Sequence, residues 1–599
     1  MMRSGFRNVL LLATAALSFT TVVTCSQSPD LTGGGSPPTQ VDDPSAEARD
    51  LNTLRLLYGR SAVTLNPHLA TGYQDFEAAR IVYEPLASYN QAGELVLFLA
   101  AAIPTVENGG VAKDGTSVTW TLRPDVTWAD GQPFTADDVV FTFEFIRNPQ
   151  VAAATAQYYE AVKSVEAVDD HTVKITFTTP NPAWSVPFTG QTGMILPRHL
   201  FEAANGPNAR EASANFQPVG TGPYQVVGFE VGTVIFEPNP TYWGGQPAFE
   251  QVELLGGTAP YAAARDVLRT GSADFAQNIQ VEAEALRELE LEAKGHITNL
   301  FGSQVERIMV NFAHPFARTE DGERSSPKIP NPYFSDLRVR QAIDLAIDRD
   351  TIAKELYGPS GKPTAQLLVE PTIYQAPEIK YTYDLTQAKA LLDAAGWVDT
   401  DGDGIRDKDG VALEVLFQAA VNPVRQSTQA IVSDSLKELG IAVQISRVRV
   451  DEFFSSDPKD TNNLNHFNAD MQVYAIGNES PDPGTYMGWW TCDKIASQAN
   501  QWQKPNNARY CNLEYDSLWN EAQQELNPEK RIALFQQMNQ ILTDDVAVIP
   551  IVHRAMTNAV SDSLANVEFT PWDASTWQIG AWARETADAA EASATGETP

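Results

Sequence analysis

The stretch SVTWTLRPDVTWADGQPFTADDVVFTFEFI, residues 117–146, decides how the chain is interpreted. Its first part alternates apolar and polar side chains, with Val118, Trp120 and Leu122 on one side, which is typical of a half-buried strand. The dipeptide Asp130-Gly131 then predicts a tight turn. The first half of the stretch is therefore expected to form a strand that ends in a turn.

A helix is expected to follow that turn. Thr135 can cap its first turn, and Asp137 and Asp138 would lie at the positive end of the helix dipole. The apolar residues that follow share one helical face: Val139, Phe143 and Ile146. Local propensity and apolar pattern agree on this assignment.

Six further segments extend the pattern. They are VYEPLASY (82–89), GMILPRH (193–199), PVGTGPYQV (218–226), NPTYWGG (239–245), VRQAIDLAIDRDTIAKELYG (339–358) and YDLTQAKALLDAAGW (383–397). Together with residues 119–144, and in this order, they resemble family 5 of the extracellular solute-binding proteins of ABC importers, which handle dipeptides, oligopeptides and sometimes nickel. The resemblance covers about residues 51–554.

The resemblance implies an α/β, periplasmic-binding-protein-like fold of type II, in which two lobes enclose a ligand cleft. Lobe I would comprise 51–90, 217–307 and 550–584, residues 91–216 would form an extra subdomain, and lobe II would comprise 308–549. The chain would cross between the lobes near Ile308 and Val548. Two adjacent crossings would let the lobes rotate and close on a ligand.

Length and charge narrow the possible functions. A chain of 599 residues is long enough for two or three domains, and 43% hydrophobic residues are typical of a soluble globular protein. The formal charge of -34 would repel nucleic acid and anionic membrane surfaces. We therefore expect no nucleic-acid partner.

The N-terminal 25 residues have the pattern of an export signal. Arg3 and Arg7 precede an apolar run, 9–23, that is too short for a spanning helix, and Cys25 follows it as in a lipoprotein processing site. The alternative is an ordinary secretory signal in which Cys25 is incidental. Residues 26–50 are expected to form a flexible tether and 585–599 a disordered tail. The protein would then be lipid-anchored outside the cytoplasm, in the periplasm or on the outer face of the membrane.

Two cysteines remain, Cys492 and Cys511. In an exported protein such a pair usually forms a disulfide. The alternative, a redox role, lacks the Cys-x-x-Cys spacing that would support it.

The segment after the apolar alternation of 471–475 contains Gly477, Asn478, Glu479 and Asp482. In the family, a carboxylate at this strand-to-loop junction pairs with the α-amino group of the ligand, and Glu479 stands at that position. The alternative is that Glu479 is a solvated loop acid and Asp482 forms a turn.

Other ligand contacts implied by the resemblance are less specific. Asn422 and Arg425 follow a predicted strand where family members sometimes bind a peptide's carboxylate, although a surface arginine is the preferred interpretation. Tyr83 and Glu84 would lie where lobe I meets the cleft, or else pack at a helix end. Trp490 would line a side-chain pocket, as would its neighbour Trp489, or else pack in the core.

Asp399, Asp401 and Asp403 resemble the first half of a calcium loop. The twelfth position is Gly410 instead of glutamate, so a turn before a hairpin at Val411 is the preferred interpretation. No zincin motif and no Gly-x-Ser-x-Gly motif occurs in the sequence, and no enzyme activity or cofactor is expected.

These features predict a monomeric, lipid-anchored binding protein that captures di- or oligopeptides and delivers them to an ABC permease with its ATPase subunits. A nickel complex, haem and an oligosaccharide are alternative ligands. The 12 tryptophans are compatible with an oligosaccharide. A secreted hydrolase is an alternative from another class.

Overall fold

The computed structural model describes residues 50–585, except 71, 292 and 456. The expected signal peptide with Cys25, the tether up to residue 49 and the tail from 586 lie outside the described residues. Within the described ranges, no helix combines the length and apolar character needed to cross a membrane.

One mixed sheet of 11 strands runs through the protein, in the order β16-β15-β17-β11-β18-β10-β1-β9-β8-β7, with β12 paired to β18. The strands are β1 (Thr53–Tyr58), β7 (Tyr224–Glu230), β8 (Thr233–Pro238), β9 (Gln251–Gly256), β10 (Phe275–Ala276), β11 (Gly295–Val310), β12 (Gly361–Pro363), β15 (Glu414–Ala420), β16 (Ala442–Val448), β17 (Met471–Ile476) and β18 (Val548–Ser561). Strand β1 is parallel to β9 and β10, and β15 is parallel to β16 and β17.

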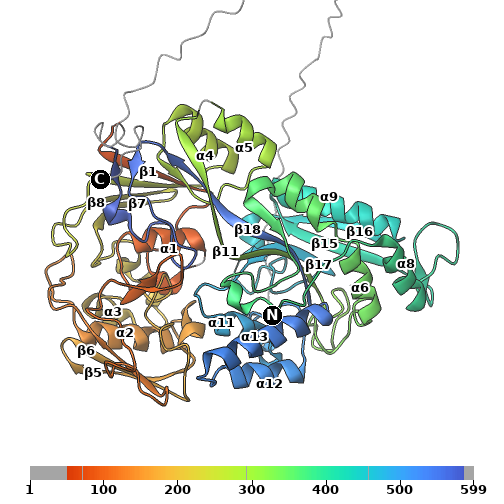
Figure 1. Cartoon of the computed structure of the whole chain (residues 1–599), viewed down its shortest axis with the longest axis horizontal. Helices are drawn as coiled ribbons and strands as arrows, with labels where there is room; N and C mark the ends of the chain where they lie inside the picture. The colour runs from red at the N-terminus through yellow and green to blue at the C-terminus, as the bar shows by residue number, and fades with distance from the viewer. Residues whose placement is uncertain (1–49, 71, 292, 456, 586–599) are drawn as a thin grey trace, which may run out of the picture. The chain divides into compact units, whose positions relative to one another are not determined.

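The two long strands β11 and β18 connect the halves of this sheet (Figure 1). They are antiparallel to each other, from Gly295 opposite Ser561 to Met309 opposite Val548. The last six residues of β11, from Val305 on, pair with β17, whereas the end of β18 pairs with β10. Each strand therefore lies partly in one lobe and partly in the other. The α/β two-lobe fold is as predicted, but both strands are longer than the short crossings expected near Ile308 and Val548.

Separate hydrophobic clusters pack against the two halves of the sheet. On the β17 side, the helices α6 (Leu337–Leu345), α8 (Leu385–Ala394), α9 (Pro423–Glu438) and α13 (Pro528–Asp544) contribute buried apolar residues. On the β1 side, α1 (Tyr73–Arg80), α4 (Pro260–Arg265) and α5 (Ala283–Glu290) do the same. The exact lobe boundaries remain a prediction, because the crossing strands belong to one continuous sheet.

The stretch that opened the sequence analysis lies in a smaller body with its own three-stranded sheet, β4-β6-β5, and a helix, α2. These are β4 (Ser117–Thr121), β5 (Val162–Asp169), β6 (Thr172–Phe177) and α2 (Ala136–Arg147). Gly131 has a φ of +85° in the turn, as a tight turn there requires. The Asp138 carboxylate accepts the Thr135 N–H at 3.0 Å, which fixes the start of α2 at the expected residue.

The remaining elements are short connections. They are α3 (Arg198–Phe201), α7 (Arg349–Thr351), α10 (Val450–Phe453), α11 (Gly484–Met487), α12 (Leu513–Ala522), β2 (Ala87–Tyr89), β3 (Leu95–Leu97), β13 (Asp407–Lys408), β14 (Val411–Ala412), β19 (Leu564–Ala565) and β20 (Ala583–Arg584).

Candidate functional site

A cavity lies between residues of the two predicted lobes. Its lining includes Tyr73, Glu77 and Gln191 from one lobe and Ser303, Asn478 and Glu479 from the crossing strand and the other lobe. Its volume of about 30 Å³ leaves room for no more than a few water molecules. A peptide can enter this site only if the lobes move apart.

Glu479, three residues after β17, presents its carboxylate to this cavity. The Tyr158 hydroxyl donates to its Oε2 at 2.5 Å, and burial raises the pKa of Glu479. Among the described residues, no arginine, lysine or histidine forms an ion pair with it. Because a half-buried carboxylate without a cation beside it is energetically costly, the geometry favours an incoming cation at this position.

The loop that carries Glu479 is fixed to strand β11. A Cβ atom on Gly477 would lie 2.1 Å from the carbonyl oxygen of Ser303, so only glycine fits this close approach. The Ser303 hydroxyl donates to the carbonyl oxygen of Asn478 at 2.5 Å. The buried Asn478 Oδ1 has no hydrogen-bond partner among the described residues and is an additional acceptor beside the cavity.

Asp482 and Trp490 do not line this cavity. The carboxylate of Asp482 forms an ion pair with Arg531 and accepts the Gly484 N–H at 2.8 Å, so its charge is already compensated. Trp490 is buried, and its ring centroid lies 5.5 Å from the guanidinium carbon of Arg307. These placements favour turn formation for Asp482 and core packing for Trp490, and a ligand contact of either residue stays a prediction.

The interpretation of Arg425 as a surface residue is wrong. Its guanidinium is buried and contacts both carboxylate oxygens of Glu306, at 2.6 and 3.2 Å. Asn422 accepts the Arg425 N–H at the start of α9 and donates to Gln280 at 2.7 Å. Both residues therefore have protein partners, and their contact with a ligand carboxylate stays a prediction.

Sequence reasoning missed a second arginine near the same acid, Arg554 in β18. It is buried, its Nη2 donates to Asn278 at 2.5 Å, and its Nε has no hydrogen-bond partner among the described residues. Burial raises the pKa of Tyr73, and its hydroxyl lies close enough to feel both the Glu479 carboxylate, which adds to this rise, and the Arg554 guanidinium, which opposes it. Arg554 gave no sequence signal, because it belongs to no motif singled out in the sequence.

Tyr83 and Glu84 pack inside the first lobe and do not line the cavity. Helix α1 ends at Arg80, and the Gly222 N–H donates to the carbonyl oxygen of Val82 at 2.8 Å, which directs the next residues inward. The Trp243 indole donates to the Glu84 carboxylate at 2.8 Å, and burial raises the pKa of Glu84 to about 7. The structure thus favours the packing alternative.

The family comparison agrees with this architecture. The pattern described as "Bacterial extracellular solute-binding proteins, family 5 Middle" matches residues 64–498, more than half of the chain. The chain belongs to this family. The resemblance noted in the sequence is thereby confirmed, and the chain is a family 5 solute-binding protein.

Curated relatives of this family 5 protein carry peptide-binding names. The oligopeptide-binding protein AppA of Bacillus subtilis is 29% identical over 374 residues, which cover 61% of this chain and 63% of AppA. The dipeptide-binding protein of Escherichia coli is 24% identical over 521 residues, covering 83% of this chain and 88% of that protein. The match to AppA spans less than two thirds of the relative's length.

Solved structures match over a longer range. NikZ from Campylobacter jejuni, in complex with Ni(L-His), has a TM-score of 0.75 at 23% identity and covers 89% of this chain and 100% of its own. AppA from Bacillus subtilis, in complex with a nonapeptide, has a TM-score of 0.74 at 22% identity and covers 89% and 99%. At these identities the matches establish the fold of the family 5 protein.

The expected disulfide between Cys492 and Cys511 is present in this family 5 chain. It joins the ends of the loop 493–510, close to Trp489 and Lys494. The disulfide therefore constrains this loop.

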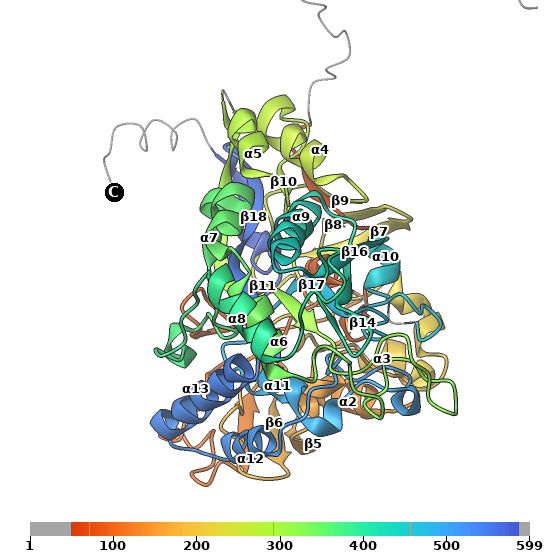
Figure 2. The same ribbon diagram turned by 90° about the vertical axis from the view of Figure 1, so that its right-hand side faces the viewer.

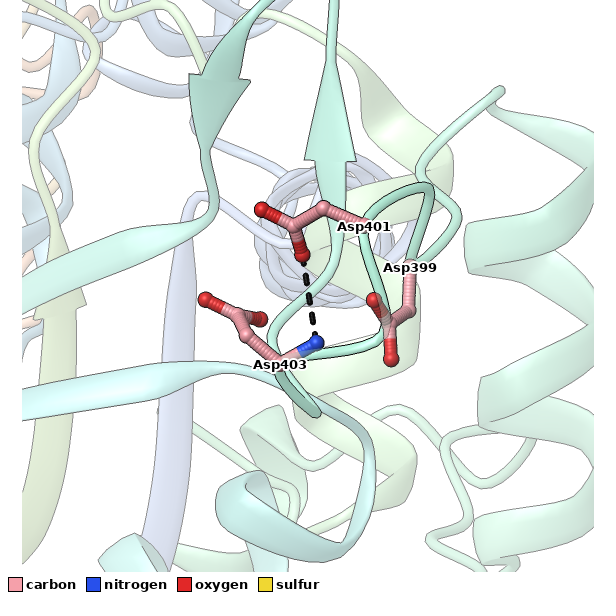
Figure 3. Close-up of side chains that lie close together, drawn as sticks. All are labelled: Asp399, Asp401 and Asp403. Atoms are coloured by element: carbon pink, nitrogen blue, oxygen red, sulfur yellow. Dashed lines mark hydrogen bonds between the residues drawn. The ribbon is translucent and has the colours of Figure 1, made fainter.

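The acidic loop of the family 5 protein forms a turn on the surface (Figure 3). Ligand atoms of Asp399, Asp401 and Asp403 lie within 4.8 Å of one another, and none of the three residues lines the interlobe cavity. Their carboxylates accept backbone N–H groups inside the loop, such as the Asp403 N–H at 3.2 Å from Asp401. The hairpin of β13 and β14 follows, which supports the turn interpretation.

Proposed function

We propose that this protein captures di- or oligopeptides between its lobes and delivers them to an ABC permease with its ATPase subunits. It acts outside the cytoplasm, as a monomer anchored through lipid on Cys25, and performs no chemistry on its cargo. The curated relatives with peptide-binding names support the peptide as cargo.

The observation that carries this proposal is the carboxylate of Glu479 in the interlobe cavity, with a hydroxyl as its hydrogen-bond partner. A peptide's α-ammonium would supply the missing positive charge. Hydrogen bonds to charged groups contribute about 1.5–3 kcal/mol, so one such contact can determine whether a small ligand binds.

A positive charge, opposite in sign to the carboxylate of Glu479, lies further along the interface between the predicted lobes. Arg425 and Arg554 are both near Glu306, so this cluster of three side chains carries a net positive charge. Asn278 and Tyr357, which belong to different predicted lobes, border Arg554. A ligand with an amino end and a carboxyl end matches this polarity, and its backbone groups can bond to strand edges.

Isothermal titration calorimetry tests the proposal with Ala-Ala, tetra-alanine, N-acetyl-Ala-Ala, maltose, haem and Ni²⁺ with histidine. We expect a free-amine peptide to bind and N-acetylation to abolish most of the affinity. Glu479→Gln should weaken Ala-Ala binding by roughly 10- to 100-fold, the equivalent of one charged hydrogen bond.

The control is Glu237→Gln, which removes one carboxylate from an exposed position on β8 and should leave the affinity unchanged. Equal binding of acetylated and free peptides, or binding of sugar, haem or nickel alone, would contradict the peptide assignment.

A further inference from the structure

A single turn of the smaller body reaches across to the second lobe. The turn Ala156–Tyr159 and the following Glu160 supply three side chains, and the segment after β17 supplies their partners. The pairs are Tyr158 with Glu479, Gln157 with Trp489, and Glu160 with Lys494. Figures 1 and 2 both show β5 and α2 at the same end of the molecule as α11 and α12. We call the three pairs the closure contact.

The closure contact is polar throughout. The Trp489 indole donates to Gln157 Oε1 at 3.2 Å, and Lys494 Nζ lies 2.7 Å from Glu160. The side chain of Glu160 is 53% exposed, so its carboxylate is already in contact with water. Polar contacts of this kind can break and re-form at modest cost.

Tyr158 differs from the other members of the three pairs, because its hydroxyl donates a hydrogen bond to the acid that faces the cavity. Closing the lobes over Glu479 without a donor would leave a buried acceptor unsatisfied, which costs about 1–3 kcal/mol or more for a charged group. Burial raises the pKa of Tyr158, so the phenol keeps its proton and remains a donor. The hydroxyl thus satisfies Glu479 in the closed protein.

We propose that Tyr158 is an internal competitor of the ligand: it closes the ligand-free protein by hydrogen bonding to Glu479, and this bond must break before cargo binds there. The inference rests on the proposed function, in which Glu479 receives the ligand's ammonium. When part of the ligand-free protein is closed, the apparent affinity is the affinity of the open form multiplied by the fraction of protein that is open. Tyr158 therefore sets how strongly a ligand must bind to be captured.

Tyr158→Phe tests the inference, because it removes the hydroxyl and keeps the ring. Small-angle X-ray scattering of the ligand-free protein should give a larger radius of gyration for the variant than for the wild type. Calorimetry with Ala-Ala should give roughly tenfold tighter binding, the equivalent of one competing hydrogen bond. Lys494→Gln breaks the third pair and should also enlarge the ligand-free protein.

Tyr159→Phe is the matched control. Its hydroxyl lies in the same turn, but its hydrogen-bond partners among the described residues belong to the smaller body: it donates to the Thr192 carbonyl oxygen at 3.4 Å and accepts the Phe188 N–H at 3.3 Å. This variant should scatter and bind as the wild type does.

An unchanged radius of gyration in Tyr158→Phe would overturn the inference, as would weaker Ala-Ala binding, which would make Tyr158 a ligand contact. The scattering measurement uses no ligand. Failure of Ala-Ala to bind any form would therefore count against the proposed function, whereas the radius alone decides whether Tyr158 closes the protein.

Discussion

Glu84, which is buried, and Glu479, which is half-buried, both have pKa values raised by burial, but their surroundings differ. Glu479 faces the interlobe cavity, where a ligand can reach it, whereas Glu84 is enclosed in the first lobe beside Trp243. Burial disfavours the charged form of both side chains. A perturbed pKa therefore indicates function only where the group also faces a space that a ligand can enter.

Glu84→Gln should change the pH dependence of stability. The pKa of Glu84 rises from the ordinary 4.5 to about 7 on folding, so between these values the folded state holds a proton that the unfolded state has lost. The wild-type free energy of unfolding should fall as pH rises through this window, by about 3 kcal/mol at most from this group. Because glutamine cannot ionise, the variant should be the more stable protein at pH 8.

Urea unfolding at pH 5, 6.5 and 8 measures this difference. Burial also raises the pKa of Glu77 to about 7, so the variant should lose part of the pH dependence and keep the rest. Glu237→Gln should follow the wild type throughout. A Glu84→Gln curve parallel to the wild-type curve would show that Glu84 is ionised in the folded protein.

At the residue scale, the sequence pointed to Glu479 and Asn478 through the family motif but misplaced other candidates. Arg425 was found by its position after a strand, yet its partner Glu306 lies 119 residues earlier in the chain. Arg554 could not be predicted as part of the site, because the residues around it come from distant segments of the chain. The local sequence pattern predicts the helix or strand in which a residue lies. The partner that compensates its charge, in contrast, depends on the tertiary structure.

At the scale of elements, local signals were reliable where a cap and an apolar face coincide. Helix α8 begins after Asp384, whose carboxylate accepts the Thr386 and Gln387 N–H groups at 2.9 Å. Helix α1, by contrast, ends at Arg80, and the chain then turns toward Gly222. That turn depends on a contact between distant segments, and no local signal marks it.

The disulfide loop 493–510 is the element whose contribution can be measured separately. Cys492 and Cys511 are separated by 19 positions, and closing a loop of this size stabilises a protein by about 3 kcal/mol through the unfolded state. Cys492→Ala/Cys511→Ala should therefore lower the free energy of unfolding by about that amount. Urea unfolding of both proteins with and without dithiothreitol measures it.

Reductant should destabilise the wild type by the same amount and leave the double variant unchanged. Equal urea midpoints for the oxidised wild type and the double variant would show that the loop is held by its other contacts, such as the bond from Asn506 to the Tyr510 carbonyl oxygen.

At the scale of the whole molecule, the crossing strands β11 and β18 make closure a coupled motion of two lobes. The resemblance predicted two lobes and two crossings, and the fold agrees. The small cavity and the closure contact could not be predicted, because both arise where lobe surfaces meet. The cavity of about 30 Å³ requires that the lobes separate before a peptide enters.

A cross-link between the lobes tests this requirement most directly. A Cβ on Gly93 would lie 3.3 Å from the Cβ of Pro481, close to the roughly 3.5–4.5 Å of a disulfide. The φ of +81° at Gly93 makes cysteine there cost roughly 1–3 kcal/mol, which the large fold can accommodate. Gly93→Cys and Pro481→Cys as single variants, and the wild type with dithiothreitol, are the controls.

The deciding measurement is calorimetry of Ala-Ala binding to the oxidised Gly93→Cys/Pro481→Cys protein. It is made before and after addition of dithiothreitol. The account predicts no measurable binding while the cross-link holds the lobes together, and recovery to the affinity of the single variants after reduction. Binding by the fully cross-linked protein with wild-type affinity would contradict the account, because cargo would then reach its site without separation of the lobes.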